Sequence, residues 1–254
     1  MLAPFKTNVF GSNVDLQTPV DVAKYANVAT RTLHIAFILD ASDSMFSIKQ
    51  QAISGFNEHV AEARRKSGLF KDVLLTLVHF NSEVYEDYFD QPLDRLADLT
   101  NATYQLGGMT ALYDAMGYTI GKLSENTNIG DLLNNYLVIT ITDGHNNNSR
   151  HFTPERIKTK IEELQKNRWT FVYVGANQDL YKAAQEMSMP ISNMMHFAAT
   201  AGGIQLANDV SRESFCSYME SAAVGDFGGT HYFSPTDEVL DTTNQAEKPN
   251  ADAA

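Results

Sequence analysis

The stretch Thr32–Asp40, TLHIAFILD, is an almost uninterrupted apolar run that ends at an acid. Such a run is typical of a strand that is buried on both faces of a parallel sheet. Residues 136–142, YLVITIT, repeat the pattern and are followed directly by Asp143. Residues 169–174 and 194–197 are shorter apolar segments of the same kind. The sequence therefore predicts several buried strands, two of which carry an acid at the carboxyl end.

Helical patterns separate these strands. Between residues 48 and 66, Ile53, Phe56 and Val60 recur at intervals of three and four, which predicts an amphipathic helix. Strands that alternate with helices predict an α/β fold, doubly wound, with a mostly parallel sheet and helices on both faces. Further helices are expected over residues 111–123, from Thr153-Pro154 onward, and over residues 179–187 and 203–221.

One pair of strands breaks the alternation. Residues 73–80 and 84–89 both have strand patterns, and only a short turn around Asn81-Ser82 separates them. Strands joined by so short a connection must be antiparallel. We expect this hairpin to place one antiparallel strand at the edge of the sheet.

The composition divides the chain into three parts. Residues 1–31 have no sustained period and are expected to form an N-terminal extension, and residues 32–221 form the predicted domain. Residues 222–254 are rich in small and polar residues, as in the ending TTNQAEKPNADAA. This composition predicts an acidic, flexible C-terminal tail.

Charge and cysteine content exclude several functions. The 254-residue chain has a formal net charge of −12, which disfavours binding to nucleic acid and to anionic lipid. Its one cysteine, Cys216, permits no intrachain disulfide and no cysteine-rich zinc site. There is neither a signal-peptide pattern nor an apolar run of about 20 residues, so we expect a soluble, cytoplasmic protein.

Oxygen-bearing side chains follow the two acid-ending strands. Asp40, Ser42 and Ser44 form D-x-S-x-S after the first strand, and Asp143-Gly144 follows the other. Thr110 ends the Gly-rich stretch GGMT, just before a predicted helix. Loops at the carboxyl ends of parallel strands form the ligand crevice of open α/β sheets, and hard oxygen ligands suit Mg²⁺ or Mn²⁺ better than zinc. Each segment alone also fits an ordinary cap or turn, but the three together favour a cation site.

The combination D-x-S-x-S, G-G-x-T and T-D-G resembles the von Willebrand factor A domain with its metal-ion-dependent adhesion site, over roughly residues 32–221. The resemblance implies that Ser42, Ser44 and Thr110 bind the ion directly in at least one state. It implies that Asp40 and Asp143 act partly through waters. A partner protein would supply an Asp or Glu as the remaining ligand. Mg²⁺ is the expected ion, with Mn²⁺ and Ca²⁺ as alternatives.

The same resemblance implies a non-enzymatic interaction module. The string FVYVGANQD, residues 171–179, is similar to bacterial and phage-borne intracellular members, which often serve as adaptors. An alternative is a Mg²⁺-dependent phosphohydrolase, although Ser42 stands where a haloacid-dehalogenase-like enzyme needs its second acid. Another is a self-assembling structural subunit whose tail supplies the acid, through the acidic and apolar residues 237–241, DEVLD.

Neighbouring polar residues have two interpretations each. Asp114 either supports the metal loops or is exposed without a role. The run at residues 146–149, NNNS, either lies at the rim of a binding face or is simply a polar loop. His145 is expected to be a solvated loop residue, because hard Mg²⁺ prefers oxygen.

Overall fold

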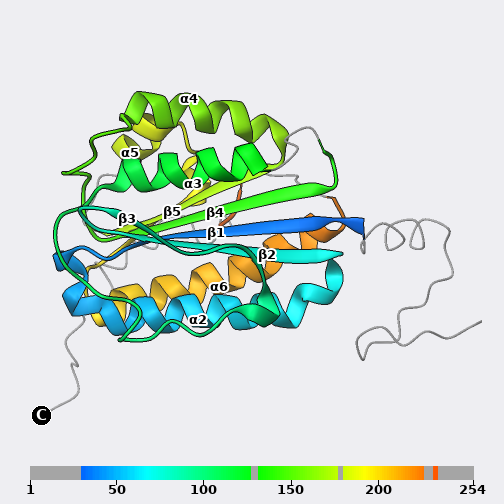
Figure 1. The fold of residues 1–254 in the computed structure, drawn as a ribbon, viewed down its shortest axis with the longest axis horizontal. Coiled ribbons are helices and arrows are strands. Elements are labelled where there is room, and N and C mark those ends of the chain that lie inside the picture. The colour runs from blue at the N-terminus through cyan, green and yellow to red at the C-terminus, as the bar shows by residue number, and fades with distance from the viewer. Residues whose placement is uncertain (1–29, 127–130, 177–179, 226–230, 234–254) are drawn as a thin grey trace, which may run out of the picture.

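The computed structural model describes residues 30–126, 131–176, 180–225 and 231–233 (Figure 1). These residues form a six-stranded sheet in the order β3-β2-β1-β4-β5-β6. The strands are β1 (Thr32–Asp40), β2 (Asp72–Phe80), β3 (Val84–Pro92), β4 (Asn134–Thr142), β5 (Trp169–Ala176) and β6 (Met194–Phe197). All neighbours pair in parallel except β2 and β3. The predicted α/β fold with one antiparallel edge strand is confirmed.

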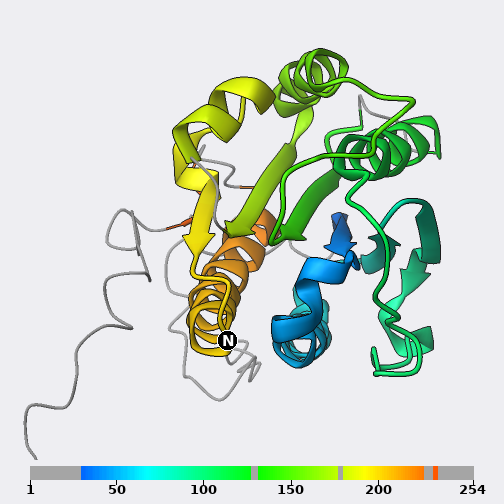
Figure 2. The ribbon, with the colours of Figure 1, turned by 90° about the vertical axis from the view of Figure 1, so that its left-hand side faces the viewer.

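Helices cover both faces of the sheet. Figures 1 and 2 show α2 and α6 on one face and α3, α4 and α5 on the other. Their bounds are α2 (Lys49–Lys66), α3 (Leu112–Asn126), α4 (Pro154–Leu164), α5 (Leu180–Met187) and α6 (Ala201–Ala223). The described residues also form short 3₁₀ turns, among them η2 (Asp43–Ile48) between β1 and α2.

The two faces of the sheet have separate hydrophobic cores. In β1, Phe37 and Leu39 point into the core under α2 and α6, whereas Ala36 and Ile38 point into the core under α3, α4 and α5. Side chains alternate across a strand, so a strand with a core on each face must be apolar throughout. This explains why TLHIAFILD shows no alternation.

The edge strand is longer than the sequence predicts. β3 continues beyond Phe89 to Pro92, and the register with β2 shifts between Leu75 and Leu77 and again between Leu77 and Val78. Next to this irregularity Asp90 has a φ of 45°, and its backbone N–H donates to Thr76 Oγ1 at 3.0 Å. Bulges that bend an edge strand are a common way to protect it from further pairing.

Two aromatic residues beyond residue 221, the predicted end of the domain, also pack against its core. Tyr232 and Phe233 are 5% and 3% exposed and belong to the core under α2 and α6. The Tyr232 N–H donates to Asn193 Oδ1 at 2.7 Å, which fixes this segment beside β6. Most of the predicted extension, residues 1–29, and residues 234–254 of the predicted tail lie outside the described residues. No helix in the described part of the chain is long and apolar enough to span a membrane.

Candidate metal centre

The ends of β1 and β4 bring the first acid into position. The two strands are parallel neighbours with Leu39 opposite Ile141, so Asp40 and Thr142 come next to each other at the carboxyl edge. Thr142 Oγ1 donates to Asp40 Oδ2 at 2.5 Å, and the Ser42 N–H donates to Asp40 Oδ1 at 2.8 Å. Asp40 is completely buried, so its carboxylate lies at the bottom of the site.

The loop after β1 meets the loop after β4 through its hydroxyls. Ser44 Oγ donates to Asp143 Oδ1 at 2.6 Å, and the hydroxyl oxygens of Ser42 and Ser44 are 3.0 Å apart. Ser42 is buried, whereas Ser44 is exposed. The chain of contacts therefore runs from the buried floor of the site towards solvent.

The Gly-rich turn before α3 lies along the first loop. The Gly107 N–H donates to the carbonyl of Ala41 at 2.9 Å, and the Asp43 N–H donates to the carbonyl of Gly108 at 3.2 Å. Gly108 has a φ of 79°, a backbone conformation that favours glycine. This turn places Thr110, which is 3% exposed, at the start of α3 beside the other two loops.

Gly144 is the point where all three loops come together. A Cβ atom on this residue would lie 3.5 Å from Thr110 Oγ1 and 3.7 Å from Ser44 Oγ. The hydroxyls of Thr110 and Ser44 thus both face the backbone that follows Asp143. The structure therefore brings the five predicted residues to one edge of the sheet: Asp40, Ser42, Ser44, Thr110 and Asp143.

Burial makes both carboxylates costly to ionise. It raises the pKa of Asp40 from 3.8 to about 6, against the opposing effect of hydrogen bonds from Thr142 and Ser42, and nearby Asp143 adds to the increase. Burial also raises the pKa of Asp143, although its hydrogen bond from Ser44 acts in the opposite direction. A cation near these carboxylates would favour their charged forms and offset the cost of burying them.

The donor set fits a hard divalent cation. Two carboxylates and three hydroxyls supply only oxygen, which Mg²⁺ prefers. In the described ranges, no cluster of three or more His, Cys, Asp or Glu side chains is placed to hold a metal ion. A soft-metal site is therefore not seen in this part of the chain, and His145 is exposed on its loop as expected.

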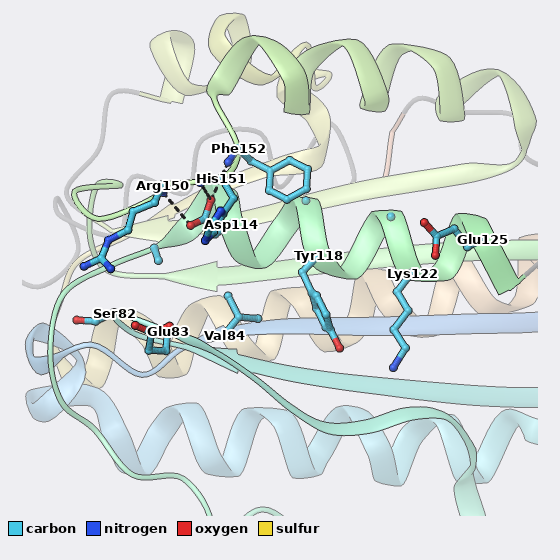
Figure 3. Close-up of a pocket in the computed structure, with 13 residues that line it drawn as sticks. Ser82, Glu83, Val84, Asp114, Tyr118, Lys122, Glu125, Arg150, His151 and Phe152 are labelled. Carbon is cyan, nitrogen blue, oxygen red and sulfur yellow. Dashed lines mark hydrogen bonds between the residues drawn. The ribbon is translucent and has the colours of Figure 1, made fainter.

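Asp114 holds residues 150–152 of the loop that follows β4. This residue of α3 is 8% exposed, and its carboxylate accepts the N–H groups of Arg150 at 2.8 Å, His151 at 2.9 Å and Phe152 at 2.8 Å (Figure 3). Its own N–H donates to Ser149 Oγ at 3.1 Å. Of the two interpretations from the sequence, the structure shows that Asp114 supports the loops.

Three further residues that the sequence does not predict as ligands contact the site. Thr142 donates to Asp40, Tyr104 donates its hydroxyl to the Asp40 carbonyl, and Asn147 Oδ1 accepts the Thr110 N–H at 2.8 Å. The sequence contains a signal only for Thr142, because pairing of the two acid-ending strands would place it beside Asp40. Tyr104 and Asn147 lie in loops whose course no local pattern predicts.

Comparisons with known proteins identify one matching family and several solved structures of low sequence identity. The sequence profile of the von Willebrand factor type A domain matches residues 34–209. Among solved structures, a mutant of the PilB minor pilin from Streptococcus sanguinis has a TM-score of 0.52 at 12% identity, covering 76% of this chain and 62% of that one. Proximal thread matrix protein 1 from the mussel byssus, with a zinc-occupied MIDAS motif, has a TM-score of 0.49 at 16% identity, covering 74% and 47%.

A third structure, the ArnB paralog VWA2 from Sulfolobus acidocaldarius, has a TM-score of 0.46 at 14% identity and covers 74% of this chain and 46% of that one. The chain thus spans about half the length of the first structures it matches. Among curated proteins, none matches. The family profile nevertheless extends over more than half of the sequence and includes all three site loops, so the chain belongs to the von Willebrand factor type A domain family.

Proposed function

We propose that this domain binds one divalent cation, preferably Mg²⁺, and uses it to capture an Asp or Glu side chain of a protein partner. Domains of this family are typically adhesion or protein-interaction modules and are usually not catalytic. The observation that carries the proposal is the meeting of three loops at Gly144, where the hydroxyls of Thr110 and Ser44 face one backbone segment and Ser44 contacts Asp143.

The charge of the site suits capture of an acid. Asp40 and Asp143 would together about neutralise a dication, and the hydroxyls of Ser42, Ser44 and Thr110 add no charge. An ion held in this way still attracts a further carboxylate. More acids around the ion would weaken that attraction. In this assignment the three hydroxyls bind the ion directly and the two acids act partly through waters, because Mg²⁺ gives up its waters reluctantly.

The phosphohydrolase alternative lacks a second acid. A haloacid-dehalogenase-like enzyme needs one two residues after the acid that ends the strand, and Ser42 stands at that position after Asp40. Mg²⁺-dependent phosphatase turnover that Asp40→Ala abolishes would overturn this assignment.

A Mg²⁺ titration by calorimetry tests the site. The wild type is expected to bind one ion, and Ser44→Ala to lose binding while keeping its fold, because Ser44 is exposed in the short 3₁₀ turn η2. Ser47→Ala is the matched control, since Ser47 is an exposed serine of the same 3₁₀ turn, three residues further on. The titration is repeated in acetate, which stands in for the partner's carboxylate. No binding by the wild type in either buffer would refute the proposal.

We further propose that the domain acts in the cytoplasm, as an adaptor in a bacterial or phage-encoded assembly. The similarity of FVYVGANQD to intracellular members of the family supports this location. Fractionation of cells that express the gene tests it, and recovery of the protein from the medium or the envelope would contradict it.

A further inference from the structure

A groove of about 700 Å³ runs beside α3, between this helix, β3 and residues 150–152 (Figure 3). Its lining includes Val84 of β3, Gly117 and Gly121 of α3, and Phe152 of the loop before α4. The groove lies on the outside of the α3 layer and takes no part in the cation site itself. Its position next to that site is what makes it informative.

Two glycines of α3, one helical turn apart, make the groove hollow. At Gly117 a Cβ would come within 2.3 Å of the Phe152 ring, so this ring lies directly on the helix backbone. At Gly121 a Cβ would meet no atom within 4 Å. Glycine in a helix costs about 0.5–1 kcal/mol relative to alanine. Alanine at position 121 would fit and would favour the helix, so the glycine there leaves space open at a cost to helix stability.

The wall on the β3 side is held in place by polar contacts. Tyr118 Oη donates to Glu86 Oε2 at 2.8 Å, and Lys122 Nζ donates to the same carboxylate oxygen. Lys122 Nζ also lies 4.1 Å from the centre of the Phe89 ring. These contacts join α3 to the edge strand, so the groove keeps its shape without a ligand.

One end of the groove lies next to the candidate metal centre. Its lining begins at Ala111, which directly follows Thr110, and includes Ser82 and Asp114. Ser82 Oγ accepts the N–H of Met109 at 2.9 Å, next to Thr110 in sequence. A partner segment with one side chain at the cation would therefore have the groove immediately beside it.

Helix geometry gives the distances along the groove. Gly117 and Gly121 come seven and eleven residues after Thr110, which at about 1.5 Å per residue corresponds to about 10 and 16 Å. An extended segment advances about 3.3 Å per residue and covers these distances in about three to five residues. A helical segment would need about seven to eleven residues.

We propose that this groove holds an extended segment of the protein partner, in which an acidic residue reaches the cation and an apolar residue, about five positions away, packs over Gly121. The inference rests on the proposed function, which supplies the requirement for an acid at one end. It adds the sequence that the partner segment must have, because the floor at Gly117 and Gly121 has no side chain and Val84 and Phe152 add apolar surface to the lining.

Charges at the ends of the groove set the direction of the segment. Figure 3 shows the Arg150 guanidinium on the same side of the groove as Ser82, where it would add to the attraction of the cation for an acid. Glu83 lies on this side too and opposes it in part. At the far end Glu125 lines the groove, and it disfavours a second acid there. The acid of the segment therefore belongs at the metal end.

A displayed library of random linear peptides, about 16 residues long, tests the proposal on the full chain. Peptides are bound in Mg²⁺ and released with EDTA, and their affinities are measured for three proteins: the wild type, Gly121→Leu and Gly202→Leu. Gly121→Leu places a large side chain at the groove, and its Cβ would meet no atom within 4 Å. Gly202→Leu is the matched control, because Gly202 is an exposed helical glycine of α6, also with no atom within 4 Å of its Cβ position.

The selected peptides are expected to share an acid and a large apolar residue about five positions apart. They should bind Gly121→Leu roughly tenfold to hundredfold more weakly than the wild type, the equivalent of losing one buried apolar side chain, and bind Gly202→Leu normally. Three results would overturn the groove proposal alone: equal binding to Gly121→Leu, a spacing of about eleven as a helical segment would need, or no Mg²⁺-dependent peptide on a protein that binds Mg²⁺. Failure of the wild type to bind Mg²⁺ with or without acetate overturns the proposed function, and the groove proposal with it.

Discussion

Replacing Asp114 is expected to destabilise the domain through the loop behind the cation site. Its carboxylate accepts three backbone N–H groups, at 2.8 to 2.9 Å, from Arg150, His151 and Phe152. Hydrogen bonds to charged groups contribute about 1.5–3 kcal/mol when buried. These donors are only partly buried, so we take about 1 kcal/mol for each and expect Asp114→Ala to lose about 3 kcal/mol.

Asp114→Asn gives a graded comparison. An amide oxygen in the place of Oδ1 still accepts from His151 and Phe152, whereas an NH₂ group in the place of Oδ2 faces the Arg150 N–H. The expected loss is about 1 kcal/mol, that of one hydrogen bond. Asp94→Ala, at an exposed aspartate of a 3₁₀ turn, is the control and should stay within about 0.5 kcal/mol of the wild type.

Urea unfolding in EDTA measures these differences as shifts of the midpoint at constant slope. Asp114→Ala should also weaken Mg²⁺ binding, because the same loop carries Asn147, whose amide oxygen accepts the N–H of Thr110. If Asp114→Ala loses less than about 1 kcal/mol, then the three hydrogen bonds do not hold the loop, and the reasoning fails.

Three further outcomes are expected. Burial raises the pKa of the Asp40 carboxyl from 3.8 to about 6, so in EDTA this residue stabilises the fold below pH 4 by on the order of 3 kcal/mol relative to pH 7, and the contribution is lost as the pH rises towards 6. Asp40→Asn should flatten that part of the pH profile of stability measured by urea unfolding. An unchanged profile would contradict the assignment of this pH dependence to Asp40. Gly203→Ala should lower stability by about 1–3 kcal/mol in thermal melts, since its Cβ would lie 2.3 Å from the Ala198 carbonyl oxygen. Gly202→Ala should not lower it, because a Cβ there would meet no atom within 4 Å. Equal melting temperatures of the two variants would refute the clash at Gly203. Deleting residues 235–254 should leave the oligomeric state, obtained from the molar mass by light scattering, unchanged in Mg²⁺ and in EDTA. A Mg²⁺-dependent dimer of the full chain alone would instead support the self-assembling alternative.

Local patterns predicted the strands and the position of the site loops closely. Thr32–Asp40 is observed as predicted, because a strand with a core on each face needs apolar residues throughout. The Thr153-Pro154 helix start is also observed, with Thr153 Oγ1 accepting the Arg156 N–H. α6 begins two residues before the predicted start, because Thr200 caps it by accepting the Gly203 N–H. Helix ends depend on such caps, which periodicity does not reveal.

The sequence by itself determined the sheet, its antiparallel edge and the three loops that carry oxygen ligands, because periodicity and turn chemistry involve residues close together in the chain. Only the tertiary structure decided which groups contact each other. Thr142 and Asp40 are 102 positions apart, and Asp114 and the Arg150 N–H are 36 apart. The groove likewise exists only because Phe152 packs on Gly117 and leaves Gly121 uncovered. Contacts of this kind depend on strand register and on the course of the loops, which are fixed when distant segments pack together.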